Sequence, residues 1–489
     1  MKVPLTFIPE PMLQFGRDQH PDIRYGIMNF GPYDLAEKRK PTAIKTGIVG
    51  TSTGVAGATR WLSQCRQRIE GKDSRKRNLF AAFPGFSSES PFLADVVLDG
   101  SLNAEVQGSE LTALAAIASF NGRVEGAVDL FLRVLQGVSQ KKPDVIVLVM
   151  PLELLSLLGE PEAADPDSPE ASVLSFRESK NKRRGKFNFH DMLKAKALPL
   201  GVPIQLLRPS TFDRSLKSKE KDDFAKSRSL QDEATCAWNF FVALYYKAGG
   251  YSWRLVRDQT QPKSCFIGIG FYESLDKSRL NTSVAQVFDE RGHGILVQGG
   301  IVQRDVVDRQ PRMDETGAYT LMREALKNYK DEHWHYPGRV VVHKTSTFNV
   351  AETAGTLRAL NELEIRSYDL LSVSDTGMRL VRNGYYPPLR GTLWQMDEQR
   401  SLLYTNGSVQ LYEEYPGLYV PRSLLIHHDR SSTDRQQIAT EVLMLTKMNW
   451  NNSQITAVEP ITIRAARQVG RIIKYAESAQ GAVPYRFFM

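Results

Sequence analysis

The chain has 489 residues, 42% of them hydrophobic, a net charge of +8 and a pI near 9.1. This length and composition exclude a disordered protein and predict roughly two to four domains with substantial cores. The positive charge favours a polyanionic partner such as nucleic acid, although many basic proteins bind none.

The three cysteines are widely spaced, so neither a disulfide framework nor a zinc site is predicted, and a reducing cytoplasm is the expected location. The sequence shows no signal peptide and no run of about 18 apolar residues, so we expect no membrane association.

The N-terminal half alternates strands and helices. Residues 1–40 are rich in Pro, Gly and aromatic side chains and are interpreted as an irregular, packed arm. A β-rich run at 43–50, a glycine-rich turn and a helix near 59–70 then form a βα unit. The turn lacks the Lys-Ser/Thr ending of an NTP-binding loop and the three-glycine dinucleotide pattern, so nucleotide hydrolysis is not expected. The alternation continues with a helix near 124–138 and a buried strand at 144–150.

A charge-polarised insert follows this strand. Five acids lie in residues 159–170, whereas residues 177–186 carry six basic residues and one acid. A solvated loop and a loop that contacts a nucleic-acid backbone both remain open for this insert.

Four polar residues in the same half form a candidate phosphate pocket. His190 and Lys194 are four residues apart, so on a helix they share one face. A strand ending at Gln205 returns beside that helix, and Lys247 lies one turn before a glycine C-cap. Singly, Lys247 could simply cap its helix and His190 could be a surface histidine. Together, two cations, an amide and an imidazole predict a site for a monophosphate.

The C-terminal half predicts an RNase H-like α/β layer. Its predicted elements are a strand at 265–271, a hairpin at 283–303 with its turn at 290–294, a helix at 314–329, a strand at 339–343, a helix at 350–363, a strand at 366–373 and a hairpin at 391–407 with Asn406-Gly407 as a turn signal.

Several motifs resemble prokaryotic Argonautes. The residues Phe30–Asp34, the four pocket residues and Tyr246–Gly250 resemble the MID domain, which grips the 5′-phosphate of a guide strand. The residues Phe266–Ile269, Val340–Lys344 and Leu445–Asn452 resemble the PIWI domain. The resemblance covers essentially the whole chain.

This resemblance implies an α/β fold with two domains. A Rossmann-like MID domain with the N-terminal arm is expected at residues 1–252, followed by an RNase H-like PIWI domain at 253–489. Because no room remains for N-terminal and PAZ domains, the chain is similar to the short Argonautes.

The resemblance also implies a degenerate catalytic site. Two-metal phosphodiester cleavage needs carboxylates from several strands that converge on the ions. Where the family pattern has Asp, Asp and a final Asp or His, this chain has Gly270, Thr345 and Ala466. Glu273 and Asp276 are nearby loop acids that cannot rebuild a tetrad. We therefore expect a protein that is not itself an enzyme.

Further site residues are carried over by the resemblance alone. It implies that Lys447, Asn449 and Arg464 face nucleic acid, although a core or solvated role for Lys447 stays open. It also implies that the C-terminal carboxylate of Met489 helps to hold Mg²⁺ at the guide phosphate.

The function implied is guide-directed immunity in the cytoplasm. A 5′-phosphorylated guide RNA would direct recognition of single-stranded target DNA from plasmids or phages. Recognition would activate a partner, an APAZ-domain effector protein with a SIR2, TIR or nuclease domain. The two proteins would form a heterodimer and, on activation, higher oligomers. The activated effector would then deplete NAD(P) or degrade DNA. The alternatives are an autonomous guide-dependent RNase H-like nuclease and a scaffold that binds a protein but no guide.

Overall fold

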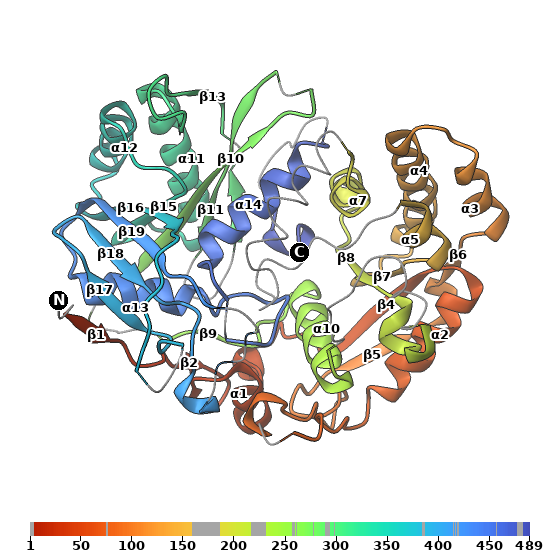
Figure 1. The fold of residues 1–489 in the computed structure, drawn as a ribbon. Helices are drawn as coiled ribbons and strands as arrows, with labels where there is room; N and C mark the ends of the chain where they lie inside the picture. The colour runs from red at the N-terminus through yellow and green to blue at the C-terminus, as the bar shows by residue number, and fades with distance from the viewer. Residues whose placement is uncertain are drawn as a thin grey trace. The chain divides into compact units, whose positions relative to one another are not determined.

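A computed structural model of the chain shows two compact units (Figure 1). Unit 1 contains Met1–Gln14, Arg254–Asn449 and Gln454–Phe488, and unit 2 contains Phe15–Trp253, Trp450–Ser453 and Met489. The described residues are 4–74, 77–158, 186–216, 231–256, 260, 262–276, 278–288, 294–297, 299–383, 387–413, 415, 417, 420–455, 457–476 and 483–489. Residues 159–185 of the predicted charged insert and residues 289–293 of the predicted hairpin turn lie outside them.

Unit 2 is built on a parallel five-stranded sheet with the order β5-β4-β7-β8, in which β6 also pairs with β4. Its strands are β4 (Ala43–Gly50), β5 (Asp95–Leu98), β6 (Ala104–Glu105), β7 (Val145–Val149) and β8 (Ile204–Leu207). Every residue of β7 is buried, which explains its unbroken Val-Ile-Val-Leu-Val sequence.

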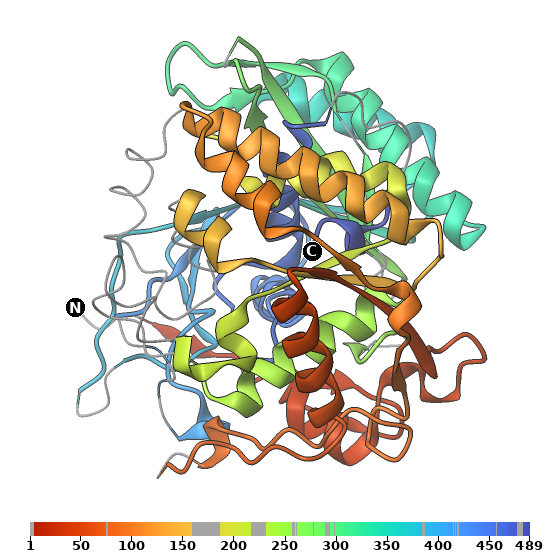
Figure 2. The same cartoon turned by 90° about the vertical axis from the view of Figure 1, so that its right-hand side faces the viewer.

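Unit 2 also contains α-helices. They are α1 (Ile23–Phe30), α2 (Ser52–Gln64), α3 (Gly108–Ala115), α4 (Phe120–Ser139), α5 (Leu152–Leu158), α7 (Phe189–Ala197), α8 (Pro209–Phe212) and α10 (Glu233–Lys247). Helices α3 and α4 lie side by side in both ribbon views (Figures 1 and 2), and Arg133 of α4 pairs with Glu110 of α3.

Two predictions for this unit were wrong. The N-terminal arm is not wholly irregular, because it contains α1, whose first turn is capped by the side chain of Asp22. Helix α2 begins at Ser52 and not near residue 59, because the Thr51 hydroxyl accepts a hydrogen bond from the backbone N–H of Gly54 and caps the helix earlier.

Unit 1 is built on an 11-stranded mixed sheet with the order β1-β17-β18-β19-β16-β15-β10-β11-β13-β14, in which β12 pairs with β11. Strands β10, β15 and β16 are parallel neighbours. The strands are β1 (Leu5–Phe7), β10 (Ser264–Glu273), β11 (Leu280–Phe288), β12 (Gly294–Val297), β13 (Ile301–Arg304), β14 (Pro311–Arg312), β15 (Arg339–Lys344), β16 (Ser367–Asp375), β17 (Thr392–Gln395), β18 (Arg400–Leu403) and β19 (Leu424–Ser431).

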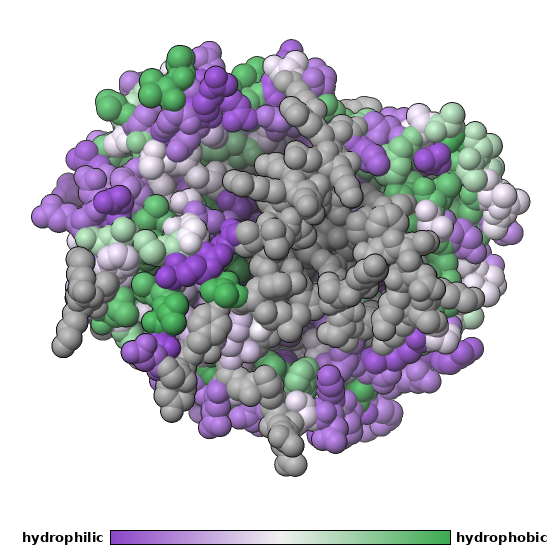
Figure 3. All heavy atoms as spheres, in the orientation of Figure 1, coloured by the Kyte–Doolittle hydropathy of each residue, from purple (hydrophilic) through white to green (hydrophobic). Residues whose placement is uncertain are grey.

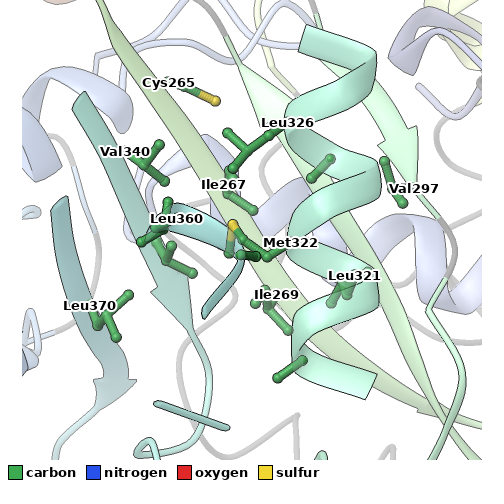
Figure 4. Packing of buried hydrophobic residues seen from close by; sticks show 14 of the residues in the cluster. Cys265, Ile267, Ile269, Val297, Leu321, Met322, Leu326, Val340, Leu360 and Leu370 are labelled. Atoms are coloured by element: carbon green, nitrogen blue, oxygen red, sulfur yellow. The ribbon is translucent and has the colours of Figure 1, made fainter. Parts of the chain in front are cut away.

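The helices of unit 1 cover both faces of its sheet. They are α11 (Glu315–His333), α12 (Val350–Glu362), α13 (Arg435–Leu445) and α14 (Ile461–Ile473). On one face, Ile267 and Ile269 of β10 belong to the same buried cluster as Met322 of α11 (Figure 4). Gly268 points to the other face, where a Cβ atom would lie 2.0 Å from the carbonyl oxygen of Thr462 in α14. Only glycine allows α14 to pack this closely on the strand.

The first 14 residues belong to unit 1, although the sequence analysis places them with the arm of the N-terminal domain. Strand β1 pairs with β17, and Glu10 lies between two cations, 2.8 Å from Arg390 and 2.9 Å from Lys447. Burial alone would raise the pKa of Glu10, but these two cations lower it below its ordinary value. The ion pairs therefore fix this segment to unit 1.

The predicted hairpin turn at Asn406-Gly407 was wrong. Strands β17 and β18 form the hairpin, but residues 396–399 join them. Asp397 closes this turn, because its side chain accepts hydrogen bonds from the backbone N–H groups of Gln399 and Arg400.

On the face shown in Figure 3, hydrophobic residues of unit 1 form scattered groups among hydrophilic ones. No helix in the described ranges has the length and apolarity needed to span a bilayer.

Candidate functional site

Three of the four predicted phosphate-binding residues lie together in unit 2. Lys194 of α7 donates a hydrogen bond from Nζ to the carbonyl oxygen of Ile204 in β8, 3.0 Å away. Gln205, the next residue of β8, accepts a hydrogen bond at Oε1 from Nζ of Lys247, the last residue of α10. Lys194 and Lys247 are 2% and 3% exposed. Two buried lysine amino groups therefore converge on one end of β8.

His190 lies one turn before Lys194 on α7, and its side chain is 36% exposed. Its Nδ1 atom lies 3.0 Å from Oδ1 of Asp191. Asp191 was not predicted as part of this site, although the N-cap spacing points to it: Asn188 caps α7 by accepting a hydrogen bond from the backbone N–H of Asp191. His190 therefore lines the accessible side of the helix that carries Lys194.

Both lysines have pKa values below the ordinary value for lysine. Burial lowers the pKa of Lys194 to about 7, an effect that the nearby Asp191 opposes. Burial and the positive charge of Lys194 lower the pKa of Lys247 well below its ordinary value. Within the described part of the chain, no ion pair joins either lysine to a carboxylate. An anion bound between them would favour the charged form of both.

Side-chain contacts hold the two residues that precede Lys247. The hydroxyl of Tyr245 donates a 2.7 Å hydrogen bond to Asp34, a buried carboxylate in the N-terminal arm. The ring of Tyr246 stacks on Trp450, with centroids 4.4 Å apart and planes 7° from parallel. These contacts fix the end of α10 and so the position from which Lys247 extends.

Met489 is buried and is part of unit 2. Its terminal carboxylate is a hard oxygen donor of the kind that Mg²⁺ prefers. The lysine pair offers no comparable ligand, because Oε1 of Gln205 already accepts from Lys247 and ammonium groups repel a cation. The donor set thus fits a Mg²⁺ ion only if the bound phosphate and water supply most of the ligands, and the ion stays a prediction.

The three positions predicted to have lost metal ligands lie in unit 1. Gly270 is in β10 at a shift of its register with β11, Thr345 directly follows β15, and Ala466 is fully buried in α14. Before Thr345, His343 is also fully buried, and its Nδ1 atom lies 2.8 Å from Oγ1 of Thr462. Burial lowers the pKa of His343 to about 4, so the imidazole is neutral.

The two nearby acids have partners of their own. Glu273 pairs with Arg304 at 2.7 Å. Hydrogen bonds from the side chains of Ser274 and Ser278 lower the pKa of Asp276 to about 2. Within the described ranges, no group of three or more His, Cys, Asp or Glu side chains could hold a metal ion.

The residues predicted to face nucleic acid are buried. Lys447 is fully buried, pairs with Glu10 and donates a 2.5 Å hydrogen bond to the carbonyl oxygen of Pro11. Asn449 and Arg464 are also buried. The ion pair with Glu10 accounts for the charge of Lys447 within unit 1, and contact with nucleic acid stays a prediction for all three.

Comparison with known proteins gives similarity in structure only. No protein-family model matches the sequence, and no curated protein matches it. The solved structure of Clostridium butyricum Argonaute bound to a guide DNA (5′ deoxycytidine) and a 19-mer target DNA matches with a TM-score of 0.66 and 15% identity, covering 100% of this chain and 55% of that one. The crystal structure of Aa-Ago with externally bound siRNA matches with a TM-score of 0.60 and 12% identity, covering 99% of this chain and 56% of that one.

The chain therefore spans about half the length of these two solved structures. The described elements form two α/β units, one on a parallel sheet and one on a mixed sheet. Along essentially its whole length, the chain has the α/β fold of Argonautes, with their MID and PIWI architecture.

Proposed function

We propose that this protein recognises target nucleic acid through a bound guide strand whose 5′-phosphate is held by Lys194, Gln205 and Lys247, with His190 beside them. The observation that carries the proposal is the buried lysine pair, which has no described ion-pair partner. Burial disfavours the charged form of both lysines, and a bound anion is the simplest way to stabilise that form.

The charge of the lysine pair favours binding of the terminal phosphate of a nucleic-acid strand over binding of its internal phosphodiesters. A terminal phosphate carries nearly two negative charges at neutral pH, whereas each internal phosphodiester carries one. Two ammonium groups match the terminal group better. Base pairing by the rest of the guide would then select the target, while the protein contacts mainly the backbone.

The proposed guide is RNA and the proposed target is single-stranded DNA. The Clostridium butyricum Argonaute structure contains a guide DNA and a target DNA, and the Aa-Ago structure contains siRNA. Binding assays with all four pairings of RNA and DNA strands would establish the preference of this chain.

Binding of matched guides tests the phosphate pocket. We expect Lys194→Ala and Lys247→Ala each to weaken binding of a 5′-phosphorylated guide by roughly tenfold or more, because each removes a charge-assisted contact. Binding of the same strand with a 5′-hydroxyl should change little. Fluorescence anisotropy with both guides measures the two affinities.

The control is Lys196→Ala on the same helix, since Lys196 is partly exposed and pairs with Asp129 at 3.2 Å. This variant should leave both affinities unchanged. Equal losses on the two guides for Lys194→Ala and Lys247→Ala would reject the phosphate role.

We further propose that the protein does not cut its target and instead activates a partner in the cytoplasm. The side chains of Gly270 and Ala466 cannot bind Mg²⁺, and the hydroxyl of Thr345 is a poor substitute for a carboxylate. The proposed partner is an APAZ-domain effector with a SIR2, TIR or nuclease domain, whose activity on NAD(P) or DNA aborts infection by plasmids or phages.

Two measurements test this second proposal. Labelled target incubated with guide, protein and Mg²⁺ or Mn²⁺ should remain intact, whereas cleavage that depends on Lys247 would establish the alternative, an autonomous nuclease. The product of the neighbouring reading frame should co-purify with the protein and become active only when guide and target are both present.

A further inference from the structure

The two buried lysines of unit 2 differ in charge near pH 7. Burial lowers the pKa of Lys194 to about 7, but the nearby carboxylate of Asp191 favours its charged form. Burial and the positive charge of Lys194 lower the pKa of Lys247 well below its ordinary value, and no described carboxylate opposes this shift. The pair therefore keeps a proton mainly on Lys194 and leaves Lys247 as a neutral amine.

The contacts of the two amino groups agree with this division of charge. Within the described residues, each amino group donates to one carbonyl oxygen, that of Ile204 for Lys194 and Oε1 of Gln205 for Lys247. Neither oxygen carries the full negative charge that would hold Lys247 in its protonated form. An amine that donates one hydrogen to a carbonyl group keeps its nitrogen lone pair, which is the nucleophile.

The surroundings hold Lys247 in place and keep bulk water away from it. The side chain is 3% exposed at the end of α10. The two preceding residues are fixed by the hydrogen bond from Tyr245 to Asp34 and by the stacking of Tyr246 on Trp450. A product formed on a buried amine is protected from hydrolysis.

A buried amine beside a cation is the environment that activates lysine for attack on a carbonyl group. The lone pair of Nζ forms a bond to the carbonyl carbon, the carbonyl oxygen takes two protons and leaves as water, and a C=N double bond remains. No electron is gained or lost, so the step needs neither an oxidant nor a reductant. The protonated imine carries a positive charge.

The charge of the pocket identifies the class of carbonyl compound. The ammonium group of Lys194 suits a phosphate monoester, and a protonated imine on Lys247 supplies the second positive charge. Both amino groups bond to oxygens of consecutive residues at one end of β8. The ligand must therefore carry its aldehyde within a few bonds of its phosphate.

We propose that Lys247 forms a reversible imine with a phosphorylated aldehyde whose phosphate is held by Lys194. The inference rests on the proposed function in placing a phosphate in this pocket. Two sources share this chemistry: a free sugar phosphate in its open form, and the 5′ end of a DNA strand whose terminal nucleotide has lost its base, because the opened sugar then carries an aldehyde beside the 5′-phosphate.

The test uses the whole chain, pyridoxal 5′-phosphate as the probe, and borohydride, whose hydride converts the imine into a stable secondary amine. Peptide mapping by mass spectrometry should place the adduct on Lys247. Surface lysines should be labelled roughly a hundredfold less at pH 7, because they are almost wholly protonated at that pH. Pyridoxal, which lacks the phosphate, should label Lys247 roughly tenfold less. A 5′-phosphorylated guide should protect Lys247, and a 5′-hydroxyl guide should not.

Variants separate the two roles. Lys247→Arg should remove the adduct, because a guanidinium group offers no neutral amine. Lys194→Gln should lower labelling of Lys247 by roughly tenfold, because it removes the charge that holds the phosphate. The matched control is Lys196→Arg on the same helix, since Lys196 is partly exposed and pairs with Asp129, and it should leave labelling of Lys247 unchanged. Mapping of the adduct in the unaltered protein does not depend on the folding of any variant.

Labelling confined to surface lysines would overturn the proposal. A preference for 5′-phosphorylated guides without an adduct on Lys247 would overturn this inference alone, whereas equal affinity for the two guides would overturn the phosphate pocket itself. A strand with an abasic 5′ end, tested in parallel, distinguishes the sources: its trapping on Lys247 would identify the end of a nucleic acid as the ligand, and trapping of the free aldehyde alone would identify a small sugar phosphate.

Discussion

Lys194 and Lys247 owe their chemistry to burial. An exposed lysine stays protonated up to a pH near 10.4, but removal from water disfavours the charged form. Burial lowers the pKa of Lys194 to about 7, although the nearby Asp191 opposes this shift. Burial and the positive charge of Lys194 lower the pKa of Lys247. The pair is therefore poised to gain protons when an anion binds.

The affinity for a 5′-phosphate should consequently depend on pH. Because phosphate binding requires the protonated lysine, the advantage of a 5′-phosphorylated guide over a 5′-hydroxyl guide should fall roughly tenfold between pH 7 and pH 9. The measurement is the ratio of the two Kd values across this range. Lys194→Arg, whose guanidinium stays charged, should flatten the dependence. Identical pH profiles for the two guides would contradict the prediction.

The same shift affects stability with a definite sign. The folded-state pKa of Lys194 lies below the unfolded value, so between about pH 7 and pH 10.4 the unfolded chain binds more protons. The contribution of Lys194 to stability should therefore rise with pH across this window. Lys194→Met should remove that part of the pH dependence, as measured by denaturant unfolding without guide.

At this scale the sequence shows residue types and spacings, but it does not show which side chains are buried. The i, i+4 spacing placed His190 and Lys194 on one helical face, yet nothing local shows that Lys194 is buried and His190 partly exposed. Lys447 illustrates the same limit, because its partner Glu10 is more than 400 residues away in the sequence. Long-range partners depend on the fold and leave no local pattern.

At the scale of elements, an ion pair joins β15 to α12. Nζ of Lys344 lies 2.6 Å from both carboxylate oxygens of Glu352, and both side chains are fully buried. Burial lowers the pKa of Lys344 to about 8, although Glu352 opposes the shift. Glu352 also accepts hydrogen bonds from the backbone N–H groups of Asn349 and Met313. One carboxylate thus caps a helix and neutralises a buried cation.

Glu352→Ala should therefore destabilise unit 1 by about 3–5 kcal/mol, since it leaves a buried charge without a partner. The denaturant midpoint of unfolding measures the loss. Glu362→Ala, at the exposed end of the same helix, should have little effect. If the double variant Lys344→Met/Glu352→Ala were no more stable than Glu352→Ala alone, the buried charge would not be the cause.

A hydrogen bond holds the arm of unit 2 to α10. Tyr245→Phe removes the hydroxyl that donates to the buried Asp34, which should cost about 1–3 kcal/mol of stability because one carboxylate oxygen loses its partner. Tyr25→Phe, which removes a tyrosine hydroxyl elsewhere in the arm, is the control. Equal thermal stability of the two variants would show that the Asp34 contact is unimportant.

Helices and strands with a strong hydrophobic pattern could be predicted from the sequence. The apolar β7 and the βαβ order around β15 follow from burial on both faces of parallel strands. Helix α1 was not predicted because it has only eight residues and follows a segment rich in Pro and Gly. The turn was wrongly predicted at Asn406-Gly407 because the observed turn depends on Asp397. Turn and cap chemistry spans a few residues and competes with longer-range contacts.

At the scale of the whole molecule, neither unit is one continuous stretch of chain. The segment Trp450–Ser453 belongs to unit 2, although the residues before and after it belong to unit 1. Trp450 stacks on Tyr246, and Ser453 donates two hydrogen bonds of 2.9 Å to Asn239, both on α10. The predicted domains meet at a single boundary between residues 252 and 253, whereas the two units exchange this short segment.

This short segment constrains how the protein can be made. Synthesis proceeds from the N-terminus, so α10 emerges from the ribosome about 200 residues before the tryptophan that covers Tyr246. Until residue 453 has been added, a nascent unit 2 exposes an aromatic face beside Lys247. A premature stop after residue 253 would yield a fragment prone to aggregation, and only chains translated past Ser453 can complete the end of α10.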